Sequence, residues 1–368
     1  MKFEISKSSL VKALSNVNGA VEKRNTIPIL LNVKIEALAG KIRLVTTDMD
    51  IVVISMVEAK VENEGQTTVP AQLFYDIVRK IPDGTNISIE LPSDGSSIKI
   101  QYNKSKFSLP CLSAEEFPIL SEGEVLVNFT IDSSELVRII DNTRFAISSD
   151  ETRHYLNGMF LHAVEKDGKV ELRGVATDGH RLALSSANVS SLKSSVPGII
   201  IPRKTTNEIR RIIEDNDKVA ISISKGKIKV ICGDSVVISK LIDGEFPEYD
   251  KVVPKDNNQL VLVDRKVIFN AIDRVATIAT DKNRSIKLIL DSGKISLQVS
   301  TSDGGFADEE IEVDFKGNKI EAGFNSRYLL EIIGQIEEEK LNIKFKDGNS
   351  PILIEVNNGL YVIMPVRI

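Results

Sequence analysis

A segment near the N-terminus returns twice further along the chain, and this repeat limits the possible folds more than any other feature. The segment F-E-I-S-K-S-S-L-V-K-A-L at residue 3 returns as F-T-I-D-S-S-E-L-V-R-I-I at residue 129 and as L-V-L-V-D-R-K-V-I-F-N-A-I at residue 260. Leu10, Leu136 and Ile268 hold equivalent places, spaced by 126 and 132 residues. Solenoid repeats are much shorter, and this spacing is that of a domain. The sequence predicts three similar modules, about residues 1–125, 126–253 and 254–368.

Each repeat predicts the same order of elements: an alternating strand, a helix, extended segments that form a hairpin, and a second helix. In the first helices the apolar residues follow the i, i+3, i+4, i+7 pattern of one helical face; they are Leu10, Ala13, Leu14, Val17; Leu136, Ile139, Ile140, Thr143; and Ile268, Ala271, Ile272, Val275. Ser6, Asp132 and Asp264 are suitable N-caps. The expected apolar sets of the second helices are Leu73, Ile77, Ile81; Ile209, Ile212, Ile213; and Leu329, Ile333, Ile336. Two helices beside antiparallel strands make an α+β module.

The junctions between modules carry proline instead of flexible Gly/Ser tracts. Phe117-Pro118 ends the first module and Phe246-Pro247 ends the second, so we expect stiff joints. The third copy ends at its last strand, which predicts that residues 366–368 form a free tail.

Composition excludes several classes of protein. At 368 residues the chain exceeds one hydrophobic core, and with 42% hydrophobic residues and a formal net charge of −5 it is typical of acidic globular proteins. No signal peptide and no apolar run of membrane-spanning length is present, so no membrane partner is expected. Cys111 and Cys232 are too few for a disulfide framework. We interpret them as buried thiols in a reducing cytoplasm.

The stretch V-A-T-D-G-H-R-L-A-L at residues 175–184 could be taken for an active site. A carboxylate can orient an imidazole, so a small-molecule hydrolase that uses Asp178 and His180 is the alternative function. However, Asp48 recurs at the equivalent place, in V-T-T-D-M-D, where Asp50 replaces the histidine. Such a residue is more typical of an Asx turn. Phosphate-loop, dinucleotide and nucleophile-elbow motifs are missing, and the three histidines lack metal-ligand spacing.

Cations recur at one place in each module, just after the first helix. These residues are Arg24, Arg153 and Arg284. Solvated helix faces would explain isolated charges, but three equivalent arginines favour one anionic target that passes all modules. A phosphate backbone offers evenly spaced charge without sequence information. Acidic runs such as Asp308-Glu309-Glu310 would repel that target elsewhere.

Several motifs taken together resemble the bacterial DNA polymerase III β subunits, the sliding clamps, over essentially the whole chain. They are A-T-D-G-H-R-L at residue 176, R-x-x-x-P-I-L at residue 24, Y-L-N-G-M at residue 155, G-E-F-P-E-Y at residue 244 and the closing Y-V-I-M-P-V-R-I. The resemblance implies a head-to-tail homodimeric ring around double-stranded DNA, acting as a processivity factor in DNA replication. It implies no catalytic residue, metal or cofactor. The implied partners are the polymerase III alpha subunit, the clamp loader and other proteins with a clamp-binding motif.

The same resemblance implies three sets of site residues. DNA contacts fall on Arg24, Arg153, His154, Tyr155, Arg203 and Lys204. A groove for partner peptides is formed by Leu156, Thr177, Gly179, His180, Arg181, Leu182, Pro247, Lys251, Val252, Val362, Met364, Pro365, Val366 and Arg367. The dimer interface involves Lys104, Lys106, Phe107, Leu109, Ile278, Asp308, Glu309 and Glu310.

Overall fold

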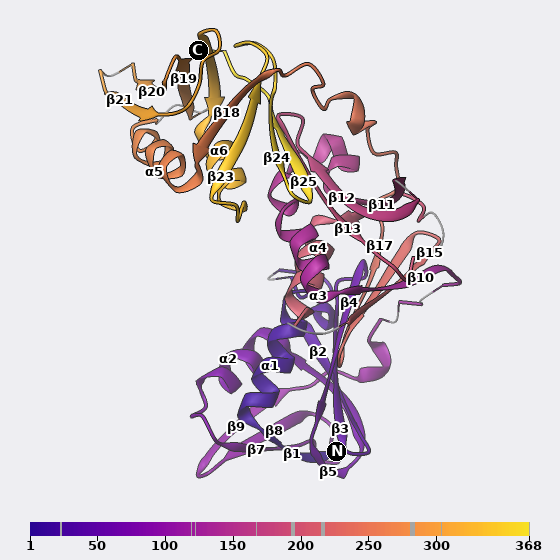
Figure 1. Cartoon of the computed structure of the whole chain (residues 1–368). Helices are drawn as coiled ribbons and strands as arrows, with labels where there is room; N and C mark the ends of the chain where they lie inside the picture. Colours follow the sequence, from indigo (N-terminus) through magenta and orange to yellow (C-terminus); the bar gives the residue numbers. More distant parts are fainter. Residues whose placement is uncertain are drawn as a thin grey trace. The chain divides into compact units, whose positions relative to one another are not determined.

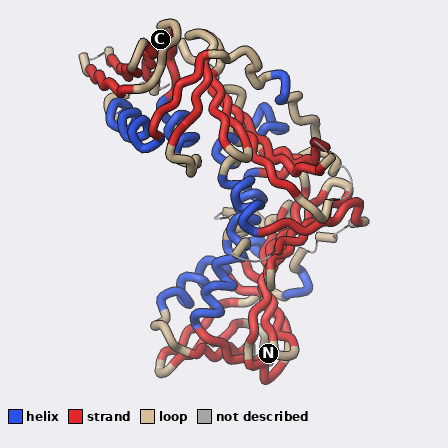
Figure 2. The backbone as a smooth tube through the Cα atoms, viewed as in Figure 1, coloured by secondary structure: helices blue, strands red, loops and turns tan. Residues whose placement is uncertain are grey.

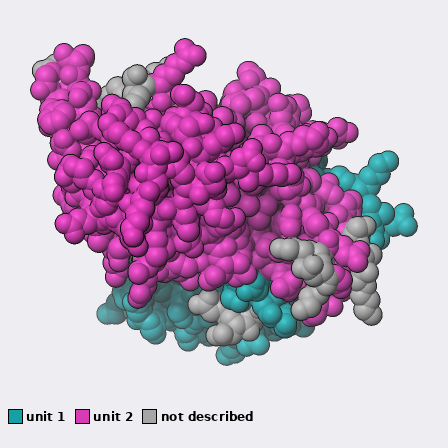
Figure 3. Space-filling view, turned by 45° about the horizontal axis from the view of Figure 1, so that its top comes forward, with its two compact units in different colours: residues 1–136, 204–241 teal, residues 137–203, 242–368 magenta. Residues whose placement is uncertain are grey.

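The computed structural model describes residues 1–22, 24–118, 120–121, 123–166, 168–192, 196–214, 218–279, 284–302 and 304–367. These residues form two compact units. The first unit contains residues 1–136 and 204–241, and the second contains residues 137–203 and 242–368 (Figure 3).

Six α-helices are described, two for each predicted module. They are α1 (Lys7–Asn18), α2 (Ala71–Lys80), α3 (Ser133–Asp141), α4 (Arg203–Ile212), α5 (Arg265–Ala276) and α6 (Ser326–Ile333) (Figure 1). Ser6 and Asp264 cap α1 and α5 as predicted, because their side chains accept the backbone N–H of the third residue along. The predicted apolar faces of α1 and α5 are buried.

The predicted buried face of α2 is wrong for Leu73, while Ile77 is half-buried and Ile81 is buried. Ala71, Phe74 and Val78 are buried, whereas Leu73, which the periodicity places inside, is 49% exposed. Apolar residues occupy both flanks of this helix, so the periodicity fits two faces. Packing against the strands selects the Phe74 face.

All strand pairs in the described chain are antiparallel, and the first unit holds two sheets. The five-stranded sheet has the order β5 (Lys60–Asn63), β1 (Lys2–Ser6), β7 (Asn86–Glu90), β8 (Ser97–Tyr102), β9 (Ser105–Pro110). The eight-stranded sheet has the order β10 (Val125–Asp132), β15 (Lys218–Ser224), β16 (Lys227–Cys232), β17 (Ser235–Lys240), β4 (Ile51–Glu58), β3 (Lys41–Thr47), β2 (Asn32–Leu38), β6 (Gly65–Pro70).

The second unit repeats this plan. Its eight-stranded sheet has the order β14 (Ile199–Pro202), β11 (Gly158–Lys166), β12 (Lys169–Thr177), β13 (Arg181–Asn188), β25 (Gly359–Ile363), β24 (Ile352–Val356), β23 (Lys340–Phe345), β18 (Gln259–Asp264). The four-stranded sheet has the order β21 (Phe306–Glu312), β20 (Lys294–Ser300), β19 (Ser285–Asp291), β22 (Ile320–Asn325). Figure 2 shows the strands and helices of both units along the backbone.

Each eight-stranded sheet joins strands from two of the predicted modules. In the first unit β4 pairs with β17, and in the second β13 pairs with β25. The central module thus shares a sheet with each neighbour, and the compact units cross the expected module boundaries. Those boundaries stay a prediction.

The helices cover one part of the core in each unit. Helix α1 packs on β4 and on α2, while α5 packs on β20, on β21 and on α6. A second apolar cluster in each unit contains one of the predicted joint aromatics, Phe117 in the first unit and Phe246 in the second. Among the helices that the structure describes, none is long and apolar enough to cross a membrane.

Candidate functional site

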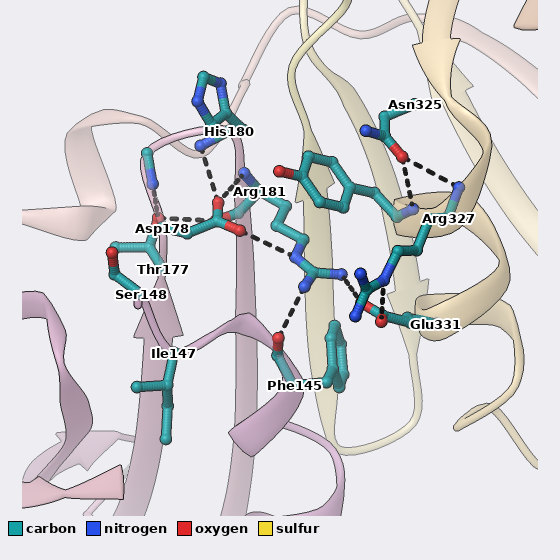
Figure 4. A network of polar contacts seen from close by, with 12 residues as sticks. Phe145, Ile147, Ser148, Thr177, Asp178, His180, Arg181, Asn325, Arg327 and Glu331 are labelled. Carbon is teal, nitrogen blue, oxygen red and sulfur yellow. Dashed lines mark hydrogen bonds and ion pairs between the residues drawn. The ribbon is translucent and has the colours of Figure 1, made fainter. Parts of the chain in front are cut away.

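The turn between β12 and β13 is built by Thr177 and Asp178. Asp178 Oδ1 accepts the backbone N–H groups of His180 at 2.9 Å and Arg181 at 3.1 Å, and Thr177 Oγ1 donates to the Arg181 carbonyl at 2.6 Å. Gly179 has φ +88°, which glycine adopts without strain. Asp178 is therefore a turn-forming residue, as predicted (Figure 4).

The turn does not form an acid–base pair. Asp178 binds the backbone N–H of His180 and not its imidazole. The His180 ring instead stacks on Tyr328, with centroids 6.4 Å apart. Within the described ranges, no group of three or more His, Cys, Asp or Glu residues could hold a metal ion. This geometry gives the hydrolase alternative no oriented general base.

Arg181 is buried and contacts several groups. Its Nε donates to Asp178 Oδ2 at 3.2 Å, Nη1 donates to Glu331 Oε2, and Nη2 donates to the Phe145 carbonyl at 2.7 Å. The guanidinium also lies 4.3 Å from the centroid of the Tyr328 ring, within cation–π range. The side chain is only 6% exposed. Arg181 thus fastens the turn to α6 instead of lining the surface of a groove (Figure 4).

Helix α6 contributes residues that the sequence did not single out. Burial would raise the pKa of the Glu331 carboxyl, but hydrogen bonds from Arg327 and Arg181 outweigh it, and the pKa lies below its ordinary value. Asn325 caps the helix by accepting the N–H groups of Arg327 and Tyr328. The Arg327 to Glu331 spacing was a sequence signal for a helix-surface pair. Nothing in the sequence signalled that Arg181 joins it.

The C-terminal segment is bound at two points. The backbone N–H of Met364 donates to the His180 carbonyl at 2.8 Å, and that of Val366 donates to the Gly323 carbonyl at 2.9 Å. The expectation of a free tail is therefore wrong for Val366, while Ile368 lies outside the described residues. Beside the tail is a pocket of about 430 Å³ lined by Glu321, Ala322, Gly323, Gly348, Asn349, Pro365, Val366 and Arg367.

The predicted groove residues all lie in the second unit and differ in burial. Leu156, Arg181, Leu182 and Val362 are buried. Thr177, Pro365 and Val366 are half-buried, and Gly179, His180, Pro247, Lys251, Val252, Met364 and Arg367 are exposed. Leu182 and Val362 share one apolar cluster with Tyr249 and Phe246 of the linker. The structure thus brings the linker, the turn and the last strand together over one apolar base.

The predicted DNA contacts are divided between the units. In the first unit Arg24 is exposed, but the Lys204 ammonium is engaged by Asp48 Oδ2 and by the Ala20 carbonyl. Lys204 therefore supports the first unit's own turn. In the second unit Arg203 Nη2 donates to the Ile147 carbonyl.

Three more of these residues lie in the short 3₁₀ segment Glu151–Leu156. Arg153 Nε donates to Asp150 Oδ2 at 2.9 Å, and its Nη1 is so near Gly179 that a Cβ there would lie 2.7 Å away. The His154 and Tyr155 rings make an edge contact at 5.8 Å. The segment therefore borders the Asp178 turn.

Most of the predicted interface residues lie on the edge strands β9 and β21, while Lys104 lies in the turn before β9 and Ile278 follows α5. Lys104, Lys106 and Phe107 are exposed, whereas Leu109 is 3% exposed and belongs to the core beneath. On β21, the hydrogen bond from Arg274 lowers the pKa of Glu309. The remaining members are Asp308, which accepts from Gln298; Glu310, which pairs with Lys294; and Ile278, which is half-buried.

Family models match this chain over nearly its whole length. They describe the N-terminal, central and C-terminal domains of the DNA polymerase III beta subunit and match residues 1–121, 130–248 and 250–367. The chain belongs to this family. Its α+β architecture is the DNA clamp fold.

Members of the clamp family resemble the chain from end to end. The beta sliding clamp of Caulobacter vibrioides is 43% identical over 100% of both chains. A Caulobacter crescentus clamp, with polyethylene glycol bound at a proposed beta-motif tethering region, has a TM-score of 0.95 at 42% identity and covers 100% of this chain and 99% of its own. A Bartonella birtlesii clamp bound to griselimycin has a TM-score of 0.95 at 40% identity, with both chains fully covered.

Proposed function

We propose that this protein is a DNA sliding clamp: two copies form a head-to-tail ring around duplex DNA and tether the replicative polymerase in the cytoplasm. The observation that carries the proposal is the repeated junction. Strand β4 of the first module pairs with β17, the last strand of the second module, and β13 of the second module pairs with β25, the last strand of the third. In the third module the strand equivalent to β4 and β13 is β21. Both β21 and β9, the last strand of the first module, are edge strands in the described chain. A heterologous contact of this kind closes a ring when its rotation closes.

The repeat also supplies a register for this contact. Strand β9 corresponds to β17, since Tyr102 pairs with Ser105 as Cys232 pairs with Ser235. Strand β21 corresponds to β4, since Thr301 Oγ1 donates to the Gly305 carbonyl as Thr47 Oγ1 donates to that of Ile51.

This correspondence sets residues of two copies opposite each other. Val236 lies opposite Ile54 within the chain, so Lys106 would lie opposite Asp308 of the second copy, and Lys104 opposite Glu310. Phe107 would lie opposite Ala307. Opposite charges at successive outward positions favour this register over slipped ones.

The groove in the second unit would bind the partners. His180, Met364 and Val252 leave apolar and aromatic surface exposed around the base formed by Leu182 and Val362, which suits short peptides of varied sequence. We assign this groove to the polymerase III alpha subunit, the clamp loader and other proteins with a clamp-binding motif, and expect it to bind griselimycin. Tethering makes re-association intramolecular, so a weak contact suffices.

Retention on circular DNA tests the proposal. The protein loaded on a nicked circle should remain bound in high salt and should leave once the circle is linearised, because a ring is held by topology and not by phosphate contacts. A matched Lys106→Glu variant should load poorly and elute as a monomer in size-exclusion chromatography. Equal rates of loss from circular and linear DNA would refute the ring.

A further inference from the structure

A partly buried polar contact outside the groove residues joins β11 to the linker between the second and third modules. His162 Nε2 lies 3.0 Å from the Tyr249 hydroxyl oxygen. Tyr249 begins the 3₁₀ turn Tyr249–Lys251, and its carbonyl accepts the N–H of Val252 at 3.0 Å. The contact therefore holds the residues from which Lys251 and Val252 project.

A neighbouring arginine contacts the same oxygen. Arg173 Nη1 lies 3.4 Å from the Tyr249 oxygen, and because a guanidinium can only donate, the Tyr249 oxygen accepts from Arg173. The Tyr249 hydroxyl can donate to His162 Nε2 when the imidazole is neutral with its proton on Nδ1. A protonated imidazole can only donate to that oxygen, and it would put a second positive charge beside Arg173.

A stack of rings holds the same linker at a second point. Phe160 lies between His162 and Phe246, with centroids 4.7 and 4.8 Å away. Phe246 and Tyr249 both belong to the apolar cluster that includes Leu182. The position of the linker over the groove base thus depends on two half-buried residues on one face of β11, Phe160 and His162.

We propose that His162 is a positioning residue for the partner groove, because its neutral ring holds Tyr249 and thereby fixes the linker wall that carries Pro247, Lys251 and Val252. The inference rests on the proposed function, since it concerns the groove assigned there. Protonation of His162 removes the hydrogen bond that Tyr249 donates, places a second positive charge beside Arg173, and weakens binding in the groove.

The surroundings of His162 favour the neutral form. Burial and the nearby Arg173 lower its pKa, and the opposing carboxylates Asp250 and Glu171 do not offset this. These charges come from β12 and from the linker, while the segment before β14 approaches with the uncharged Gly198. Because the pKa in the folded state is depressed, the contact is complete at neutral pH and is lost as the pH falls below the ordinary histidine value of about 6.5.

The test measures griselimycin affinity by calorimetry between pH 8.0 and pH 5.5. Wild type should lose affinity at least about threefold on acidification. His162→Gln keeps an acceptor oxygen and should retain neutral-pH affinity with a flatter pH profile. His162→Phe keeps the stacked ring but no acceptor, and should bind weakly at every pH. The contribution of His180 is common to all three proteins.

Identical pH profiles for wild type and His162→Gln would overturn the inference. A second measurement needs no variant: hydrogen exchange of the Val252 amide in wild type, corrected for intrinsic rates, should lose protection at pH 5.5, and unchanged protection would also overturn it. If griselimycin fails to bind wild type at any pH, the groove assignment fails, while the exchange experiment still decides the role of His162.

Discussion

Two turns of the same construction, one in each unit, lead into the two strands that join modules. At Thr47–Ile51 an aspartate accepts the backbone N–H groups two and three residues on, and the threonine hydroxyl donates to the carbonyl that starts the next strand. The turn at Thr177–Arg181 has the same three hydrogen bonds. The conformations also agree, with φ +79° at Met49 and +88° at Gly179. Their different functions must therefore come from the side chains around them.

The first difference is at the strand end beside each turn. The backbone N–H of Lys240 donates to the Asp50 carbonyl, and the backbone N–H of Met364 donates to the His180 carbonyl in the same way. In the first unit the Lys240 ammonium also pairs with the Asp50 carboxylate at 2.8 Å. In the second unit Met364 and His180 form no such ion pair and stay exposed. In the first unit an ion pair joins the turn to the strand end, whereas in the second unit the same place presents an exposed surface that suits apolar peptides.

The second difference is the cation on the turn aspartate. Asp48 pairs with Lys204, whose side chain is 35% exposed, whereas Asp178 pairs with Arg181, which is buried and also bonded to Glu331. The planar guanidinium can reach several partners at once, which an ammonium on a flexible stem does less well. The second turn is consequently fixed to α6, so that the exposed groove residues stand on a rigid support.

The largest effect should come from removing the buried cation. Arg181→Ala removes the cation from Asp178 and one of the two cations from Glu331, which keeps Arg327, and should destabilise the second unit by about 3 kcal/mol. Lys204→Ala should cost at most about 1 kcal/mol, because its ion pair is partly solvated. Native-state hydrogen exchange of β13 and β4 amides measures each unit separately. Equal losses would remove the distinction between the turns.

Exchanging the side chains of the turn and the strand end between the two units should also exchange which unit has the exposed apolar surface and which has the ion pair. The double variant His180→Asp with Met364→Lys should form an ion pair between the turn and the strand end of the second unit. It should weaken griselimycin binding at least tenfold, which corresponds to about 1.4 kcal/mol of binding free energy. The reciprocal pair, Asp50→His with Lys240→Met, should leave griselimycin binding unchanged. Calorimetry on both double variants provides the comparison. Undiminished affinity in the first would show that these two residues do not form the groove.

The shared construction of the turns can be tested with the threonines. Thr47→Val and Thr177→Val each remove one hydroxyl that bonds a backbone carbonyl, so each should cost about 1 kcal/mol. Hydrogen exchange of the backbone amides in β4, which begins at Ile51, and in β13, which begins at Arg181, measures the two losses of stability. A clear inequality would mean that the turns are alike in shape but not in energetics.

The smallest effect we expect is the response to acid. Glu331 in the second unit and Glu36 in the first both have pKa values below the ordinary one, because hydrogen bonds from cations outweigh burial. Their contributions to stability are complete above the ordinary carboxyl pKa and decline as the pH falls through the lowered one. Hydrogen exchange of backbone amides near each carboxylate should show this decline in stability below about pH 5. In Glu331→Gln the decline should become weaker near α6 only. A decline that survives in Glu331→Gln would assign it to other carboxylates.

Much of the fold could be predicted from local sequence. The repeat at residues 10, 136 and 268 predicted similar modules, and one-sided apolar patterns with good caps predicted α1 and α5. The recurrence of Asp48 and Asp178 predicted a turn at a place that could be taken for an active site. Such features depend on residues a few positions apart, whose geometry the backbone itself sets.

The candidate site could be predicted only in part. The buried face of α2, the engagement of Lys204 by Asp48, the burial of Arg181 against α6 and the attachment of Val366 to β22 all went unpredicted or were predicted otherwise. Each depends on partners far away in the sequence, and α2 carries apolar residues on two flanks. By itself the sequence determined the repeated helices and the turn. Tertiary packing alone decided which cations and apolar side chains are buried as supports and which remain exposed to bind, because burial depends on what the folded chain brings opposite each residue.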